Sequence, residues 1–409
     1  MKIFINLLVA LTASLMASFA LAQTWVPARA PSEDWEAVAS SADGSKLIAG
    51  SQQDIYCIST NSGFTWITNT EPQAGSGNGS WTCIASSADG NKYAAINGAS
   101  IWVSTNSGTT WFSNNVPGAS WLAFAALSAD GNKLVVVDGK STSPGQIYSS
   151  TNWGVTVTPT TAPAIHWVSV AASADGTKLV AAGTIYSQNV GFIYTSTNSS
   201  LTWTLTGAPT NQFWAAVASS ADGSKLVAAS GASFGSDQPN GGIFTSTDFG
   251  MTWASNSVPP AQWESVASSA DGTRLVAVAI EPVGLIYTST NSGITWVSNN
   301  VPNDSWISVA SSADGGEQLV APLGDQSFKP QPIYISQTWP SPHLNLTPSS
   351  TNLTLGWTVP SKNFVVQQSA DLTSWSVATN PPGLNLTNLQ NQIILSPTNR
   401  SGFYRLKTP

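Results

Sequence analysis

The chain has 409 residues, of which 42% are hydrophobic and only 9% are charged, and its formal net charge is −7. This length can form one large domain and a smaller second one. Binding to nucleic acid or to an anionic membrane surface requires a basic patch, which an acidic and charge-poor chain does not favour. We therefore expect the partner to be a glycan or a protein, and not a nucleic acid.

The first 22 residues predict a secretory signal peptide. Lys2 supplies the positive start, an apolar run follows to Leu15, and Ala20-Leu21-Ala22 fits the small-residue cleavage rule before Gln23. An uncleaved membrane anchor is the alternative, but the apolar run is short for a bilayer crossing. We expect cleavage and export, to the periplasm, the cell surface or the medium, with no later segment spanning a membrane.

A Trp, a Val- and Ala-rich stretch and an Ala-Asp-Gly turn recur seven times along the chain. The turn aspartates follow one another at intervals of 41 to 49 residues, and they are Asp43, Asp89, Asp130, Asp175, Asp222, Asp271 and Asp314. Within one unit, residues 263–268, 274–279, 285–288 and the segment ending at Trp296 predict four antiparallel strands. All-β units of this length predict the blades of a seven-bladed β-propeller.

The second turn of each unit carries the pattern Ser-x-Asp-x-Gly-x-Thr-Trp, which resembles the Asp-box, or BNR repeat. One copy matches in full and three carry Asn for Asp, whereas Ser200 replaces Gly in one copy and Val157 replaces Trp in another. An Asx side chain can accept backbone N–H groups inside such a turn, so we expect a structural role. The residues concerned are Asn61, Gly63, Trp66, Asn106, Gly108, Trp111, Asp248, Gly250, Trp253, Asn291, Gly293 and Trp296.

The seventh unit ends at residues 333–336 without a normal fourth strand. The segment Thr24-Trp25-Val26 resembles the fourth-strand ending Thr110-Trp111-Phe112, so we expect the N-terminal strand to complete the last blade. These boundaries predict a propeller over residues 23–340. Residues 341–409 predict a small β-sandwich of the immunoglobulin or fibronectin type. Through residues 364–372, Trp375 and residues 403–406, this segment resembles a C-terminal module of exported bacterial proteins, which implies display or attachment.

Cys57 and Cys83 are the only cysteines. The repeat places them on adjacent blades, where an exported protein could form a disulfide, and two buried thiols are the equal alternative. Neither a metal site nor a cofactor motif is present in the pattern of His, Cys and Gly residues.

Short, regular turns are expected on one face of the propeller and variable loops on the other, which is where binding usually occurs. A tryptophan opens the innermost strand of each unit, and packing between blades is the expected role, with an aromatic platform for a ligand as the alternative. The candidate platform is Trp35, Trp81, Trp121, Trp167, Trp214, Trp263 and Trp306, and the candidate polar residues beside it are Asp34, Glu36, His166, Gln262 and Glu264.

Asp-box propellers include sialidases, other glycoside hydrolases, photosystem II assembly factors and receptor ectodomains. The sialidase resemblance implies a clamp of three arginines, which cannot be built from Arg29, Arg274, Arg400 and Arg405. We expect a secreted, monomeric binding or scaffold propeller without catalytic residues. The alternative is a glycoside hydrolase that uses rim carboxylates such as Glu36 and Glu264.

Overall fold

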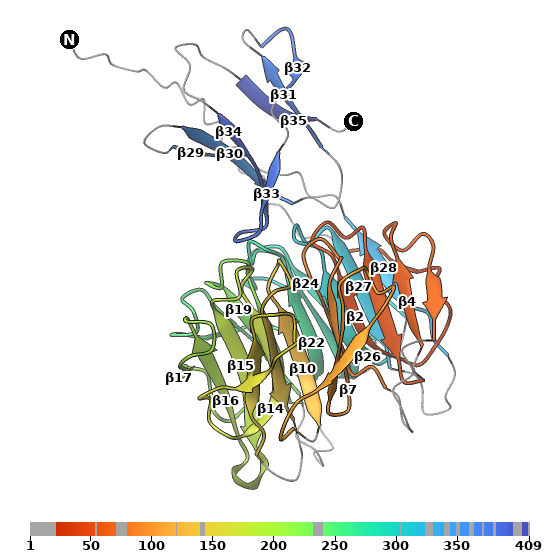
Figure 1. Ribbon diagram of the computed structural model, residues 1–409, viewed down its shortest axis with the longest axis vertical. Coiled ribbons are helices and arrows are strands. Elements are labelled where there is room, and N and C mark those ends of the chain that lie inside the picture. The colour runs from red at the N-terminus through yellow and green to blue at the C-terminus, as the bar shows by residue number, and fades with distance from the viewer. Residues whose placement is uncertain are drawn as a thin grey trace, which may run out of the picture.

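The computed structural model describes residues 22–409 except 54, 71–79, 120, 140–143, 232–239, 283, 303, 324–329, 339–343, 349–351, 360–363, 370–371, 379–381, 396–402 and 408–409. The predicted signal peptide therefore lies outside the described residues, apart from Ala22. The described part is all-β, with a single 3-10 turn, η1 (Tyr186–Gln188). Figure 1 shows a ring of sheets with a smaller group of strands standing on one of its faces.

Seven four-stranded antiparallel sheets form the ring, as the repeats predicted. Blades 1 to 3 are β2 (Trp35–Ser40), β3 (Leu47–Ser51), β4 (Tyr56–Ser59) and β5 (Ile67–Asn69); β6 (Cys83–Ser86), β7 (Tyr93–Asn97), β8 (Ser100–Ser104) and β9 (Phe112–Asn115); and β10 (Leu122–Leu127), β11 (Leu134–Asp138), β12 (Ile147–Ser150) and β13 (Thr158–Pro159).

Blades 4 to 6 repeat this order. They are β14 (His166–Ala172), β15 (Leu179–Ile185), β16 (Val190–Ser196) and β17 (Thr204–Leu205); β18 (Trp214–Ser219), β19 (Leu226–Ser230), β20 (Ile243–Ser246) and β21 (Ala254–Ser255); and β22 (Gln262–Ser268), β23 (Leu275–Glu281), β24 (Ile286–Ser289) and β25 (Val297–Ser298). The first strand of every blade contacts the first strands of both neighbours, so the seven blades surround a central channel.

Blade 7 confirms the predicted closure. It contains β26 (Trp306–Ser311), β27 (Glu317–Pro322) and β28 (Tyr334–Gln337), and its outer strand is β1 (Trp25–Pro27) from the start of the propeller. Trp25 pairs with Ser336 and is 7% exposed. Because the two ends of the propeller share one sheet, unfolding of either end must break the hydrogen bonds that hold the other.

A closed circle of backbone hydrogen bonds lines one end of the channel. In every blade the alanine of the Ala-Asp-Gly turn donates its N–H to the carbonyl of the corresponding alanine in the next blade, at 2.7 to 2.8 Å. Ala313 of blade 7 donates to Ala42 of blade 1 and completes the circle. The members of this alanine ring are Ala42, Ala88, Ala129, Ala174, Ala221, Ala270 and Ala313.

A lysine beside the turn in blades 1 to 5 reaches to the next blade in the same rotational sense. The Nζ atoms of Lys92, Lys133, Lys178 and Lys225 donate to the carbonyl of the following turn aspartate at 2.7 to 2.9 Å. Lys92 and Lys178 also lie over the rings of Trp153 and Phe249 in that next blade. These contacts join neighbouring blades through charge-assisted hydrogen bonds and cation–π contacts.

The junction between blades 7 and 1 has an acidic residue at the position of these basic residues. Glu317 occupies the lysine position and packs against Gly44, as Lys46 packs against Gly90 at the next junction. The Glu317 side chain is 1% exposed, and its Oε2 accepts a hydrogen bond from Gln337 Nε2 at 3.5 Å. A carboxyl group therefore closes a ring that lysine or arginine joins elsewhere.

The C-terminal strands form two further sheets. One contains β29 (Asn345–Pro348), β30 (Leu353–Thr358), β33 (Gly383–Asn385) and β34 (Gln390–Leu395), and the other contains β31 (Val365–Ser369), β32 (Ser376–Val377) and β35 (Phe403–Lys407). Trp357, Ile393 and Val366 form a buried cluster that joins the two sheets. The immunoglobulin or fibronectin type of this segment stays a prediction.

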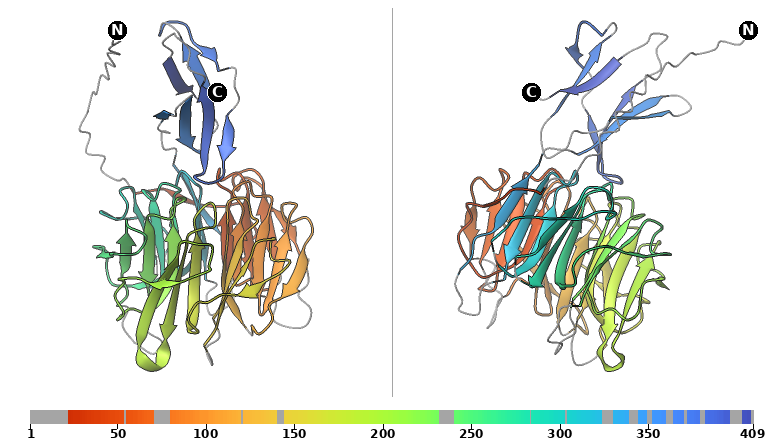
Figure 2. Two further views of the ribbon diagram at one scale, coloured as in Figure 1. Left: turned by 60° about the vertical axis from the view of Figure 1, so that its left-hand side comes forward. Right: turned by 180° about the vertical axis from the view of Figure 1, so that it is seen from behind.

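The turn between β33 and β34 reaches the propeller. Leu389 packs against both halves of the alanine ring and lines the cavity at that end of the channel. Figures 1 and 2 show the C-terminal sheets above this face, with the hairpin directed at the propeller. Leu389 therefore covers the channel mouth on the face of the Asp-Gly turns.

Replacing Glu317 by Gln tests the junction between blades 7 and 1. Burial, helped by the charges of Asp43 and Asp314 and opposed by hydrogen bonds from Ser62 and Gln337, raises the pKa of Glu317 to about 8. The unfolded chain then ionises at lower pH than the folded one, so the free energy of unfolding falls as pH rises from about 4.5 to about 8. The Glu317→Gln variant should lack this pH dependence. At pH 8 its free energy of unfolding should exceed that of the wild-type protein by on the order of a few kcal/mol.

Denaturant unfolding of both proteins at pH 5 and pH 8 measures this difference. The matched control is Glu281→Gln, because Glu281 is exposed. Equal pH dependence in the wild-type protein and the Glu317→Gln variant would contradict the assignment of a buried, protonated carboxyl group to this junction.

Candidate binding site at the channel mouth

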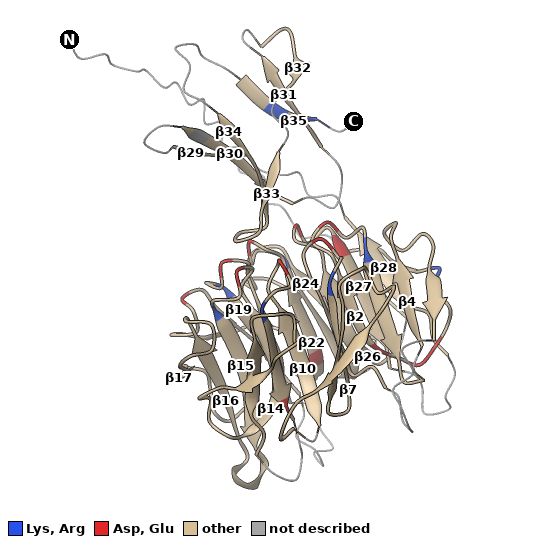
Figure 3. Ribbon diagram, viewed as in Figure 1, with Lys and Arg blue, Asp and Glu red and all other residues tan. Residues whose placement is uncertain are grey.

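The structure separates a regular face from a variable face, as predicted. On the regular face the Asp-box turn of each of blades 1 to 6 donates a backbone N–H to the neighbouring Asp-Gly turn, for example Ser62 to Ser45 at 2.9 Å. Figure 3 shows that most charged residues gather along this face, towards the C-terminal sheets. The opposite face carries the links between blades and the loops between second and third strands, of which 140–143, 232–239 and 324–329 lie outside the described residues.

Six of the seven candidate tryptophans are buried and cannot form a platform on the surface. Trp35, Trp81, Trp167, Trp214, Trp263 and Trp306 are 0 to 3% exposed. Five of these rings, all except that of Trp35, pack edge-on against an aromatic ring of a third strand, with centroids 5.3 to 6.2 Å apart. This position stabilises the contacts between blades by filling large gaps in their core.

Trp121 differs because it does not occupy the position of the other six. Leu122 pairs with Asp138, as Trp35 pairs with Ser51, so Leu122 is the buried residue of blade 3. The assignment of Trp121 to the ring is therefore wrong by one residue. The spacing could have revealed this, since Trp35 precedes its turn aspartate by eight residues and Trp121 by nine.

The displaced Trp121 lies on the rim of the channel and is 49% exposed. The next blade contributes His166 and Tyr186, whose ring centroids are 5.0 Å apart, and Tyr186 is 47% exposed. Phe213 and Gln262 occupy the equivalent rim positions of blades 5 and 6 and are partly exposed. His166 and Gln262 were predicted from the sequence, whereas Tyr186 was not, because η1 forms only in the loop of blade 4.

In all blades except blade 2, a β-bulge in the first strand directs one further residue into the channel. In blade 1 the register shifts between Trp35 and Ala37, and in blade 6 between Trp263 and Ser265, so Glu36 and Glu264 are the extra residues. Both line a cavity of about 440 Å³, whose walls are otherwise mainly Ala, Val and Ser. Glu36 and Glu264 are the only charged residues among the described ones that line it.

Both channel carboxyl groups have a raised pKa in a cavity whose described lining contains no basic residue. Burial raises the pKa of Glu264 to about 7, and the charge of Glu36 adds to the shift. The pKa of Glu36 is raised mainly by burial and partly by Asp34, while a hydrogen bond from Gln52 opposes the shift. Asp34 itself is 4% exposed, so it supports this region of the rim from inside the protein.

The Asp-box residues form bonds within their own turns. Asp248 Oδ1 accepts the N–H of Thr252 at 2.9 Å, and hydrogen bonds from Thr252 lower the pKa of Asp248. Asn61, Asn106 and Asn291 accept the equivalent N–H group, while Gly63, Gly108 and Gly293 take the left-handed conformation. Indole N–H groups of Trp66, Trp111 and Trp253 donate to the carbonyls of Gly63, Gly108 and Gly250, whereas Trp296 Nε1 has no hydrogen-bond partner among the described residues.

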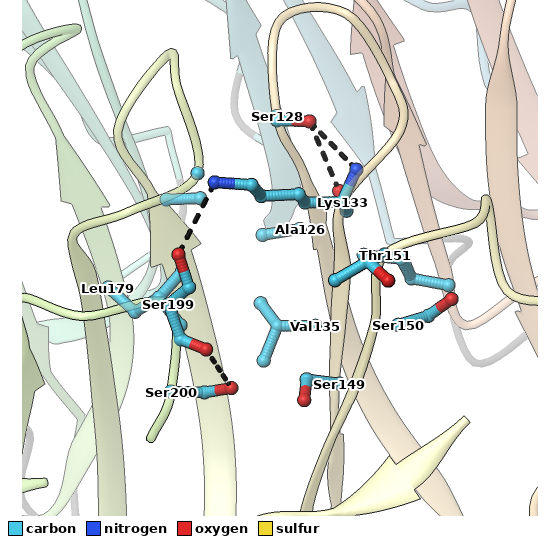
Figure 4. A pocket seen from close by; sticks show the side chains of 13 residues that line it. Ala126, Ser128, Lys133, Val135, Ser149, Ser150, Thr151, Leu179, Ser199 and Ser200 are labelled. Atoms are coloured by element: carbon cyan, nitrogen blue, oxygen red, sulfur yellow. Dashed lines mark hydrogen bonds between the residues drawn. The ribbon is translucent and has the colours of Figure 1, made fainter. Parts of the chain in front are cut away.

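Ser200 keeps this geometry where the box lacks glycine. Its φ is +70°, and its N–H donates to Ser196 Oγ at 3.1 Å, as the glycine N–H does in other copies. Figure 4 shows Ser199 and Ser200 beside a cavity of about 30 Å³ between blades 3 and 4, where Lys133 reaches Ser199. This space holds about one water molecule and is too small for a larger ligand.

Cys57 and Cys83 are free, buried thiols in this structure. Cys57 belongs to the core between blades 7 and 1, and Cys83 to the core between blades 2 and 3. Burial raises the pKa of the Cys83 thiol to about 12. The alternative of a disulfide is therefore not realised here.

The described residues contain no group of three or more His, Cys, Asp and Glu side chains that could hold a metal ion. They also contain no helix with the length and hydropathy needed for crossing a membrane.

No protein-family model and no curated protein sequence matches the chain. Its fold is similar to YCF48 from Cyanidioschyzon merolae, with a TM-score of 0.55 and 15% identity over 77% of this chain and 98% of that one. YCF48 bound to D1 peptide gives 0.56 and 11% over 78% and 97%. The GH74 xyloglucanase from Xanthomonas campestris gives 0.59 and 14% over 82% of this chain but 59% of that one. At these identities the likeness shows the propeller fold alone.

Alanine substitutions of Trp35 and Trp121 compare a buried core position with an exposed rim position. Trp35→Ala should destabilise the protein by about 3 to 5 kcal/mol, because it removes a fully buried indole. Trp121→Ala should change the free energy of unfolding by less than about 0.5 kcal/mol, because half of the side chain is already in water. Denaturant unfolding of both variants checks this, and a large loss in Trp121→Ala would show that Trp121 belongs to the core.

Titration of Glu264 tests the coupling in the channel. Its carboxyl resonance, followed by ¹³C NMR, should report a pKa of about 7. Glu36→Gln should lower this pKa, because the substitution removes the neighbouring negative charge. The exposed Glu281→Gln variant serves as the control, and an unshifted Glu264 in Glu36→Gln would show that the two groups do not interact.

Proposed function

We propose that this protein is a secreted, non-catalytic binding or scaffold propeller whose ligand, a glycan or a protein segment, binds the channel mouth on the variable face. The observation that carries the proposal is the contrast between the two mouths. Leu389 covers one mouth, whereas the other is surrounded by Trp121, His166, Tyr186 and Gln262. Exposed aromatic rings beside polar groups are suited to sugar rings and to peptide chains.

Known propellers of this fold support both ligand classes. One solved YCF48 structure contains a D1 peptide, and the GH74 protein is a xyloglucanase. Because fold does not assign function, the site itself must decide between them. The shortage of basic residues around the described rim favours a neutral or basic ligand over an acidic one.

The segments on either side of the propeller serve its export and its attachment. Residues 1–22 direct export, and residues 341–409 form a sandwich of the immunoglobulin or fibronectin type that displays or attaches the propeller. The two C-terminal sheets and their shared cluster around Trp357 support this assignment. The protein acts as a monomer, with one channel mouth available to its partner.

The second candidate function is glycoside hydrolysis. Glu264 favours it, because a carboxyl group with a pKa of about 7 is protonated often enough at neutral pH to act as a general acid. Glu36 would then be the second carboxylate that this chemistry requires. The same shift also follows from two acids sharing a channel without a cation, so it does not require catalysis.

Binding to a panel of glycans and peptides, measured with the complete mature chain, tests the first candidate. Trp121→Ala and Tyr186→Ala should each weaken the binding of a captured ligand by about tenfold, the usual loss for an aromatic contact at an interface. The control is Phe64→Ala, because Phe64 is 59% exposed on the opposite face. Binding that responds to Phe64→Ala and not to the rim variants would place the ligand on the wrong face for this proposal.

Release of reducing ends from the same glycans tests the second candidate. We expect no turnover by the wild-type protein. Hydrolysis that disappears in both Glu264→Gln and Glu36→Gln, with folding retained, would replace the binding function by an enzymatic one.

A further inference from the structure

The channel is a pocket with one accessible end, given the proposed function on which this inference rests. The cavity of about 440 Å³ begins at the level of Glu36 and Glu264, next to the variable face. It continues into a second cavity of about 160 Å³ that ends at the alanine ring and Leu389. A group that enters from the variable face must therefore pass Glu36 and Glu264, which lie on the two blades beside blade 7.

The charge in this pocket is not compensated by the protein. None of the described residues that line the two cavities is basic. Glu36 accepts a hydrogen bond from Gln52, whereas Glu264 has no hydrogen-bond or ion-pair partner among the described residues. Asp34, two residues before Glu36, is 96% buried, and its Oδ1 has no hydrogen-bond partner in the described structure.

The arrangement of the two acids is specific to their blades. The bulge position carries Glu in blades 1 and 6 and Ile307 in blade 7 between them, while Ala123, Val168 and Ala215 occupy it in blades 3 to 5. Ionised carboxylates beside an apolar wall are costly unless a cation pairs with them. A cation held by both acids would relieve this cost, and the apolar walls below them would cover its hydrocarbon part.

The cation could be a metal ion or an organic ammonium or guanidinium group, and these have different requirements. A divalent metal prefers several oxygen ligands, and no group of three metal-binding side chains is present among the described residues. An ammonium or guanidinium group needs only hydrogen-bond acceptors around a positive charge. Its methylene stem can lie along Ala, Val and Ile side chains.

We propose that the channel binds a lysine or arginine side chain of a protein ligand, with its cationic group between Glu36 and Glu264 and its backbone across the aromatic rim. The flanking residues of that ligand contact Trp121 and Tyr186, which are the most exposed aromatic side chains of the rim. This assignment makes the ligand a protein and gives Glu36 and Glu264 a binding role.

Two short peptides test the proposal on the complete mature chain. The probes are acetyl-Gly-Lys-Gly-amide and the same peptide with norleucine, which keeps the stem and lacks the charge. Saturation-transfer NMR and calorimetry at low salt should give at least about tenfold tighter binding of the lysine peptide. Glu264→Gln and Glu36→Gln should each reduce this preference, whereas Glu281→Gln, which alters an exposed acid outside the channel lining, should retain it.

The outcomes separate the two proposals. Equal binding of the lysine and norleucine peptides, or a lysine preference that survives the Glu36→Gln/Glu264→Gln double variant, would overturn the cation site. A ligand that lacks basic groups and depends on Trp121 would overturn it as well, while leaving the proposed function intact. If no glycan or peptide shows binding that depends on Trp121 or Tyr186, the proposed function itself fails.

Discussion

Closure of the ring is the constraint on which the rest of this structure depends. Each blade alone has two open edges and an apolar face on either side, so it is stable only between two neighbours. The alanine ring fixes the spacing of the blades at one end of the channel, because all seven N–H···O bonds must form at 2.7 to 2.8 Å simultaneously. The buried tryptophans set the spacing towards the other end.

This scaffold leaves few positions free to carry function. The first strands need small or apolar residues where they pack, and the Asp-Gly turns and Asp-boxes use their polar groups internally. The bulge residue and the residue before the buried tryptophan or leucine are different, because one faces the channel and the other faces the rim. Glu36, Glu264 and Trp121 occupy these two positions, which explains how a regular ring can hold an asymmetric site.

Much of the fold could be predicted from the sequence. The repeat spacing predicted seven blades, and the fragment Thr24-Trp25-Val26 predicted the strand exchange that closes blade 7. Local patterns of this kind reflect hydrogen bonds between residues close in sequence. They do not report which residues meet across the channel.

The site was less accessible to sequence reasoning for that reason. A single extra residue moved Trp121 from the core to the rim, and the bulges that direct Glu36 and Glu264 inward have no signature in the chain. Leu389 lies 76 residues after Ala313, in a segment without repeats, and nothing in its neighbourhood indicates contact with the alanine ring. Contacts of this kind depend on the closed ring and not on local pattern.

Glu317 has a consequence for how the ring responds to stress. At six junctions the stem of a lysine or arginine packs on the glycine of the next turn, but at the seventh the buried side chain of Glu317 takes this place. Because one junction between blades differs from the other six, the ring has one place at which it opens first. Alkali, which ionises Glu317, would open the ring between blades 7 and 1 first and leave an arc of seven blades joined by the six other junctions.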